Sequence, residues 1–139
     1  PLTPSDPRQA ARMNQVMSVN DWYLFPGVAN VIVFHRIISP RLLGGIPDEA
    51  AIEAAMPHAR LVVAELARLL GDQPFMAGGK LTLADLHVAP NLAMMAETPE
   101  WVALSTEHSN LLAWLARVEA RPSFHATSWE RVAALAQAA

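Results

Sequence analysis

The sequence predicts an all-α fold, a bundle of about six helices around one buried central helix, with no β-sheet. Hydrophobic residues make up 53% of the 139 residues and charged residues 17%, a composition that supports a sizeable core in one domain. Apolar side chains recur at helical spacing along most of the chain. Neither the sustained alternation typical of strands nor an internal repeat of fixed period is present.

The first helix is predicted over residues 7–24, because Asp6 can cap it and Pro7 suits its first position. Pro26 and Gly27 are expected to break or kink this helix. A second apolar stretch, residues 28–38, has strand propensity but keeps helical spacing, so we expect it to continue the helix toward Pro40. Residues 39–47, rich in proline and glycine, are a predicted loop.

The next helix is predicted over residues 49–70, with Asp48 as its cap and Gly71 as its stop. Pro57 should bend it. One face is apolar throughout, at residues Ile52, Met56, Ala59, Val63, Leu66 and Leu70. This pattern is typical of an amphipathic helix packed on a core.

Residues 81–86 carry the most specific helix start in the chain. With Thr82 as the N-cap, Asp85 holds the third helical position, so each side chain can bond the other's backbone N–H in a capping box. Leu81 and Leu86 occupy the positions of a hydrophobic staple. The helix that follows, residues 83–96, is apolar nearly all round and is the predicted central helix. Asp85 is therefore interpreted as a helix cap rather than as a catalytic carboxylate.

Two further helices are predicted near the C-terminus. One covers residues 109–120 and ends before Pro122, and the other covers residues 128–137. Thr127 and Glu130 are expected to form a capping box that opens the last helix. Residues near Pro99 and Glu107 are predicted turns.

Composition argues against several functional classes. The net charge of −3 argues against a nucleic-acid partner. Without cysteine the chain has no disulfide, thiol nucleophile or zinc knuckle, which fits a cytoplasmic location. No apolar run is long enough for a membrane span, and no leader peptide is expected. The histidines never pair at i, i+4, so no metal site is predicted, and the Gly78-Gly79-Lys80 stretch lacks the spacing of a phosphate loop.

Residues 74–86, which read PFMAGGKLTLADL, closely resemble the C-terminal helical domain of glutathione S-transferases. That family has an aromatic-Leu-Ala-Gly turn there, followed by a Thr/Ser-x-Ala-Asp box; Met76 stands where leucine is commoner. Residues 113–124 resemble a late segment of the same domain, and residues 6–29 resemble its first helix. The resemblance covers nearly the whole chain, and its details are similar to bacterial transferases related to the beta or phi-like classes.

In this family, glutathione and the catalytic Ser, Tyr or Cys lie on an N-terminal thioredoxin-like domain, which nothing in the sequence matches. The resemblance thus implies that residues 1–7 end an interdomain linker and residues 8–139 form a single C-terminal domain. It implies no catalytic residue in this chain and no cofactor, with glutathione as co-substrate of the intact enzyme. A homodimer is expected by the same resemblance.

The resemblance also implies that this domain supplies the hydrophobic wall for an apolar electrophilic substrate, with its first helix facing the cleft between the domains. The candidate wall residues are Ser18, Asp21, Trp22 and Phe25 on the first helix, and Pro90 and Met94 on the central helix. Trp22 and Phe25 could equally pack against the core or the other domain, and Met94 is more often a core filler than a ligand contact.

Two other functional classes remain open. Transferase-like helical domains also occur as non-catalytic interaction modules in translation factors and synthetase complexes. A stand-alone helical domain would leave an apolar patch that contains Trp22, Tyr23 and Phe25 exposed. The reading frame upstream of Pro1 distinguishes these alternatives, since a thioredoxin-like sequence there favours the enzyme. Reductase, isomerase and dehalogenase activities on the same scaffold stay open too.

Overall fold

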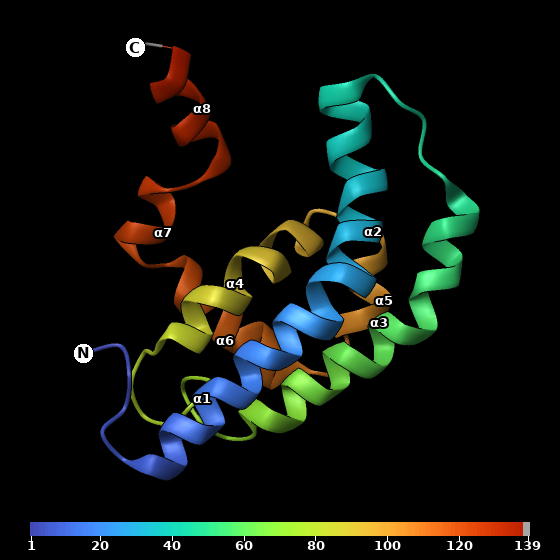
Figure 1. The fold of residues 1–139 in the computed structure, drawn as a ribbon. Coiled ribbons are helices and arrows are strands. Elements are labelled where there is room, and N and C mark those ends of the chain that lie inside the picture. The colour runs from blue at the N-terminus through green and yellow to red at the C-terminus, as the bar shows by residue number, and fades with distance from the viewer. Residues whose placement is uncertain (138–139) are drawn as a thin grey trace.

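The computed structural model describes residues 1–137. Their regular secondary structure consists of helices (Figure 1). The described part of the chain contains one isolated antiparallel bridge, between Phe75 and Gly78, and no strand. The elements are α1 (Pro7–Val19), η1 (Asn20–Ala29), α2 (Asn30–Val33), η2 (Phe34–Leu43), α3 (Glu49–Leu70), α4 (Leu83–Ala96), α5 (Glu100–Ser105), α6 (Ser109–Glu119), α7 (Pro122–Ala126) and α8 (Trp129–Gln137). The predicted fold class is confirmed.

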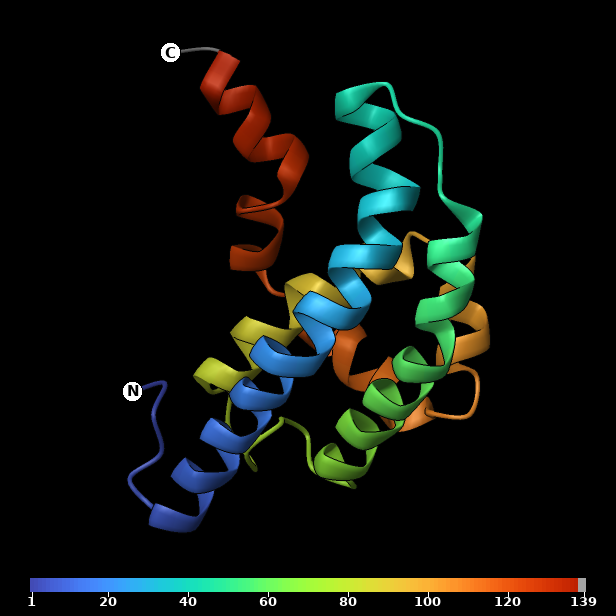
Figure 2. The same ribbon diagram turned by 45° about the vertical axis from the view of Figure 1, so that its right-hand side comes forward.

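The first four elements form one continuous helical rod along the molecule (Figures 1 and 2). Pro26 and Gly27 do not break the helix; of the predicted break or kink, only a change of direction between α1 and α2 is seen. The predicted loop over residues 39–47 begins later than expected, because the rod runs past Pro40 to Leu43. Both prolines lie in π-helical stretches, where the Asn30 N–H bonds the carbonyl of Phe25, five residues back. The wider π turn gives the proline ring more room and accommodates its missing N–H.

Helix α4 lies at the centre of the bundle, against α1, η1, α5 and α6 (Figure 2). Its inward residues Ala84, Val88, Ala89, Leu92 and Met95 are completely buried. The α3 side of the core closes around Leu66 and Leu70, which are also buried. These buried positions and the contacts of α4 with four other elements confirm its prediction as the central helix, although one strip of α4 stays open to solvent.

Local caps act where the sequence predicts them. Asp6 Oδ1 accepts the Gln9 N–H at 2.9 Å, and Asp48 Oδ1 accepts the N–H of the third residue of α3 at 3.0 Å. Gly71 ends α3 with a φ of 55°, a value that favours glycine. Pro57 lies inside α3, which stays continuous across it.

The capping box of α4 is confirmed, and its carboxylate has a wider role than a cap. One oxygen of the completely buried Asp85 accepts the Thr82 N–H at 2.8 Å and the Thr82 hydroxyl at 2.9 Å. The other oxygen accepts the Met76 N–H and the Trp114 Nε1–H, both at 2.8 Å. Asp85 therefore joins the start of α4 to the preceding loop and to the middle of α6.

The C-terminal third differs from the prediction in two places. Pro99 and Glu107 lie in turns as predicted, but the short helix α5 between them was not predicted. Helix α7 was not predicted either, and it begins at Pro122, which suits a first helical position. The Thr127–Glu130 box is wrong, because the Thr127 hydroxyl donates to the Ser123 carbonyl at 3.0 Å and so belongs to the end of α7. Ser128 caps α8 instead, since its hydroxyl oxygen accepts an N–H of the first turn at 3.4 Å.

The first residues of the chain lie against the bundle, because the Leu2 carbonyl accepts the Leu83 N–H at 3.1 Å. This bond satisfies one of the free donors at the start of α4. Within residues 1–137, no helix combines the length and the hydrophobicity that a membrane crossing requires.

Candidate functional site

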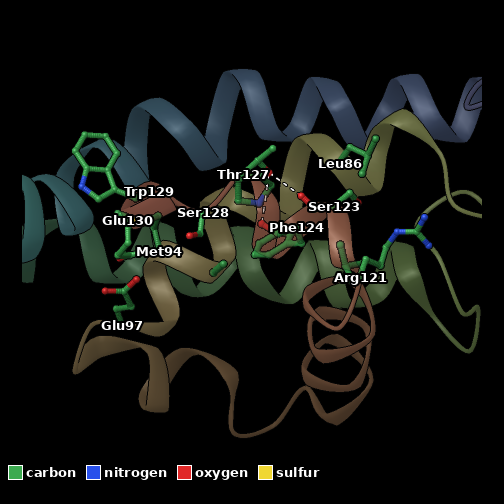
Figure 3. A pocket seen from close by; sticks show the side chains of 13 residues that line it. Leu86, Met94, Glu97, Arg121, Ser123, Phe124, Thr127, Ser128, Trp129 and Glu130 are labelled. Carbon is green, nitrogen blue, oxygen red and sulfur yellow. Dashed lines mark hydrogen bonds between the residues drawn. The ribbon is translucent and has the colours of Figure 1, made fainter. Parts of the chain in front are cut away.

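A groove with a cavity volume of about 430 Å³ lies between α4 and the α7–α8 segment (Figure 3). Most of its lining is apolar. The residues that form it are Leu86, Pro90, Ala93, Met94, Glu97, Val118, Arg121, Ser123, Phe124, Thr127, Ser128, Trp129 and Glu130. A concave apolar surface with a few polar groups at its edges is the usual form of a small-molecule site.

The floor of this groove is one strip of α4. Leu86, Pro90, Met94 and Glu97 follow one another at intervals of three or four residues, so they lie on the same side of the helix. Because α4 is fixed by its buried opposite face, the strip has a rigid base. Phe124 on α7 forms part of the facing wall.

The apolar surface continues past Met94 to the end of the long first rod. A smaller hollow is lined there by Ile37, Ile38, Arg41 and Leu42 of η2, together with Met94, Glu97, Trp129 and Glu130. Trp129 is 56% exposed and borders both spaces. The groove and the hollow thus share one end, at the start of α8.

The structure places only part of the predicted wall in this groove. Pro90 and Met94 line it, whereas the four candidates on the first rod do not. Trp22 and Phe25 are 76% and 50% exposed on η1, and Ser18 and Asp21 are exposed as well. The neighbouring Tyr23 is exposed and lies close to a ring of α3. These residues form a second surface, which aromatic side chains dominate.

A small polar network ties η1 to α4 beside that aromatic surface. His87 Nε2 lies 2.5 Å from Asp21 Oδ1, and the Asn20 amide donates to the same oxygen at 3.2 Å. The Asn91 amide donates to Asn20 Oδ1 at 2.9 Å. The hydrogen bonds from His87 and Asn20 hold the pKa of Asp21 below its usual range.

We expect Asp21→Asn to lower the free energy of unfolding slightly, by about 0.5 kcal/mol at neutral pH, because the pair is exposed. Because folding lowers the pKa of this carboxyl, the ionised group stabilises the native state at pH values above the pKa that it has in the unfolded chain. This stabilisation is lost as the pH falls through the pKa that the carboxyl has in the folded protein. The difference between the two proteins should therefore shrink as the pH falls below about 4. Urea denaturation at several pH values measures it; a difference that grew in acid would contradict the assignment.

The sequence did not identify the side of the groove that α7 and α8 supply. Phe124 belongs to the RPSF stretch that carries the resemblance, and Trp129 is an aromatic residue at the start of a helix. Neither signal reveals that these residues face α4. In the part of the chain that the structure describes, no group of acidic residues and histidines is arranged to hold a metal ion. The apolar lining of the groove is suited to hold an apolar molecule.

Comparison with protein families gives one match that covers most of the chain. The profile described as "Glutathione S-transferase, C-terminal domain" matches residues 31–122. A glutathione S-transferase of Hyoscyamus muticus is 31% identical over 123 residues, which are 88% of this chain and 57% of that protein. The apo structure of glutathione S-transferase III superposes with a TM-score of 0.78 at 29% identity, over 96% of this chain and 58% of that one.

One relative that aligns over the full chain is not named as a transferase. FtsZ-localized protein A of Caulobacter vibrioides is 26% identical over 145 aligned residues, which correspond to 100% of this chain and 60% of that protein. The chain spans about half the length of the relatives it matches, 48% of glutathione S-transferase F14 of Arabidopsis thaliana for example.

Proposed function

Because the chain belongs to the glutathione S-transferase C-terminal domain family, we propose that it is the part of a glutathione transferase that holds the electrophilic substrate. The observation that carries this proposal is the apolar groove of about 430 Å³ along α4. Its Met94 and Phe124 offer a polarizable and an aromatic surface to an apolar molecule. Such a lining tolerates ligands of varied shape.

The reacting thiolate comes from glutathione bound to an N-terminal thioredoxin-like domain. There a group of that domain lowers the thiol pKa, the sulfur attacks the electrophilic carbon, and a leaving group departs with its bonding electrons. The described lining of the groove contains neither histidine nor cysteine. This composition fits a wall that binds and orients the substrate while another domain supplies the nucleophile.

The surface of Ser18, Asp21, Trp22 and Phe25 is the side of this domain that faces the thioredoxin-like domain. Its exposed aromatic rings would lose contact with water there, which favours association. In this proposal the partners of the whole protein are the thioredoxin-like domain, a second copy of the protein in a homodimer, and the apolar electrophile. The proposed location is the cytoplasm.

Binding of para-nitrotoluene, an unreactive analogue of a nitroaryl electrophile, tests the groove. Replacing Met94 with glutamate places a charge in the apolar floor, so we expect at least tenfold weaker binding, about 1.4 kcal/mol. Quenching of tryptophan fluorescence follows the titration. Thermal unfolding of the variant checks that the fold is kept.

Leu61→Glu is the matched control, because Leu61 is 71% exposed on α3 and does not line the groove. It makes the same change of charge and should leave the affinity unchanged. Equal affinities of the parent protein and the Met94 variant would mean that the probe binds elsewhere, and the groove would lose its assigned role.

A second candidate function is a non-catalytic interaction module, favoured by the match to FtsZ-localized protein A along the whole chain. The name of that relative describes its location with FtsZ. Cosedimentation with FtsZ filaments distinguishes the two functions. The transferase proposal expects the chain to stay in the supernatant, whereas saturable pelleting favours the interaction module.

A further inference from the structure

We propose that the groove selects a ligand with a positive charge at one end, that is, an apolar aryl or alkyl body that carries an ammonium group. This inference rests on the proposed function, because it names the ligand class for the same groove. It comes from the distribution of charged side chains around the apolar lining.

Charged groups of opposite sign lie at opposite ends of the groove. Glu97 and Glu130 gather with Trp129 near Met94, whereas Arg121 lies at the other end (Figure 3). The apolar floor separates the two ends. A ligand that fills the groove is therefore oriented by charge, with any cationic group directed away from Arg121.

The acidic end keeps a net negative charge. Arg41 Nη2 lies 3.3 Å from Glu97 Oε2, so these two exposed side chains offset each other. Among residues 1–137, Glu130 takes part in no ion pair. Beside an apolar wall the field of its carboxylate is less screened than in open water, which strengthens its attraction for a cation.

Trp129 gives this end a second means to bind a cation. Its indole is 56% exposed and borders both the groove and the hollow beside η2. The face of an indole attracts ammonium groups, by about 0.5–1 kcal/mol at exposed sites. Glu130 follows Trp129 directly at the start of α8, so the ring and the carboxylate lie at the same end of the groove.

Three matched linear probes test the inference on this chain: phenylbutylammonium, phenylbutanol and phenylbutanoate. Isothermal titration calorimetry at low salt should give about fivefold tighter binding of the cation than of the alcohol, and the anion should bind weakest. In Glu130→Gln the ratio of the affinity for the cation to the affinity for the alcohol should fall to about half of its parent value or less, while the affinity for the alcohol stays the same. Glu53→Gln, an exposed change of the same kind on α3, should keep the preference.

The outcomes separate this inference from the proposed function. If the alcohol binds and Met94→Glu weakens it, but the cation binds no tighter, the charge assignment is overturned and the groove keeps its role. A preference for the cation that persists in Glu130→Gln also overturns it. If none of the probes responds to Met94→Glu, the proposed function fails as well.

Discussion

Replacing Asp85 with alanine is expected to lower the free energy of unfolding by about 4 kcal/mol, at the upper end of what single substitutions cause. The carboxylate is completely buried and accepts four hydrogen bonds, two from Thr82, one from Met76 and one from Trp114. Removing it leaves these buried donors without their acceptor, and each buried donor then costs about 1–3 kcal/mol.

Asp85→Asn keeps the shape of the side chain and gives the milder test if the alanine variant does not fold. One amide oxygen can still accept two of the bonds, but the NH₂ group would face donors, so we expect a loss of about 2 kcal/mol. Urea denaturation followed by circular dichroism measures both variants. Asp72→Ala, an exposed change of the same type, should lie within about 0.5 kcal/mol of the parent.

A loss below about 1 kcal/mol in Asp85→Ala would mean that the four bonds contribute little to the fold. A double-mutant cycle with Trp114→Phe then isolates the long-range bond. Coupling between the two sites is expected, because the Trp114 indole donates directly to the carboxylate.

The second large effect is expected from Arg36→Met, about 2 kcal/mol of unfolding free energy. Arg36 joins three elements: its guanidinium donates to Glu49 at 2.5 and 2.8 Å and to Glu100 at 2.9 and 2.6 Å. The Glu100 side chain is only 10% exposed, so removing the cation leaves a largely buried carboxylate without its partner. Arg36 also lowers the pKa of Glu49 through the hydrogen bonds between them.

Arg68→Met is the control, because Arg68 pairs with Glu65 at 2.7 Å on the surface, with side chains 66% and 39% exposed. Its loss should cost far less than the loss of Arg36, because solvent screens an exposed pair. Adding Glu100→Gln to Arg36→Met should restore part of the stability, since the orphaned charge is removed. Urea titrations that give equal losses for the two arginine variants, or no recovery in the double variant, would argue against this network.

Features that depend on neighbours in sequence could be predicted from the sequence. The caps at Asp6 and Asp48, the stop at Gly71 and the box at Thr82 each depend on residues within one turn. The centrality of α4 also followed from the composition of one segment, because a helix without a polar face has to be buried.

Features that depend on distant partners could not be predicted. The identity of Asp85 indicates a cap, but nothing local reveals that a tryptophan 29 residues away donates to it. Pro26 and Pro40 end α-helices by local rules, yet the rod continues through them as π-helix. Met94 and Trp129 line the same groove because α8 packs near α4, and no local pattern in the sequence predicts that packing.

Calorimetric titration of this chain with glutathione and, separately, with para-nitrotoluene tests the central claim most directly. The account predicts binding of the nitroaryl probe that Met94→Glu weakens, and no micromolar binding of glutathione. Micromolar affinity for glutathione, together with binding of the nitroaryl probe that Met94→Glu does not change, would contradict it.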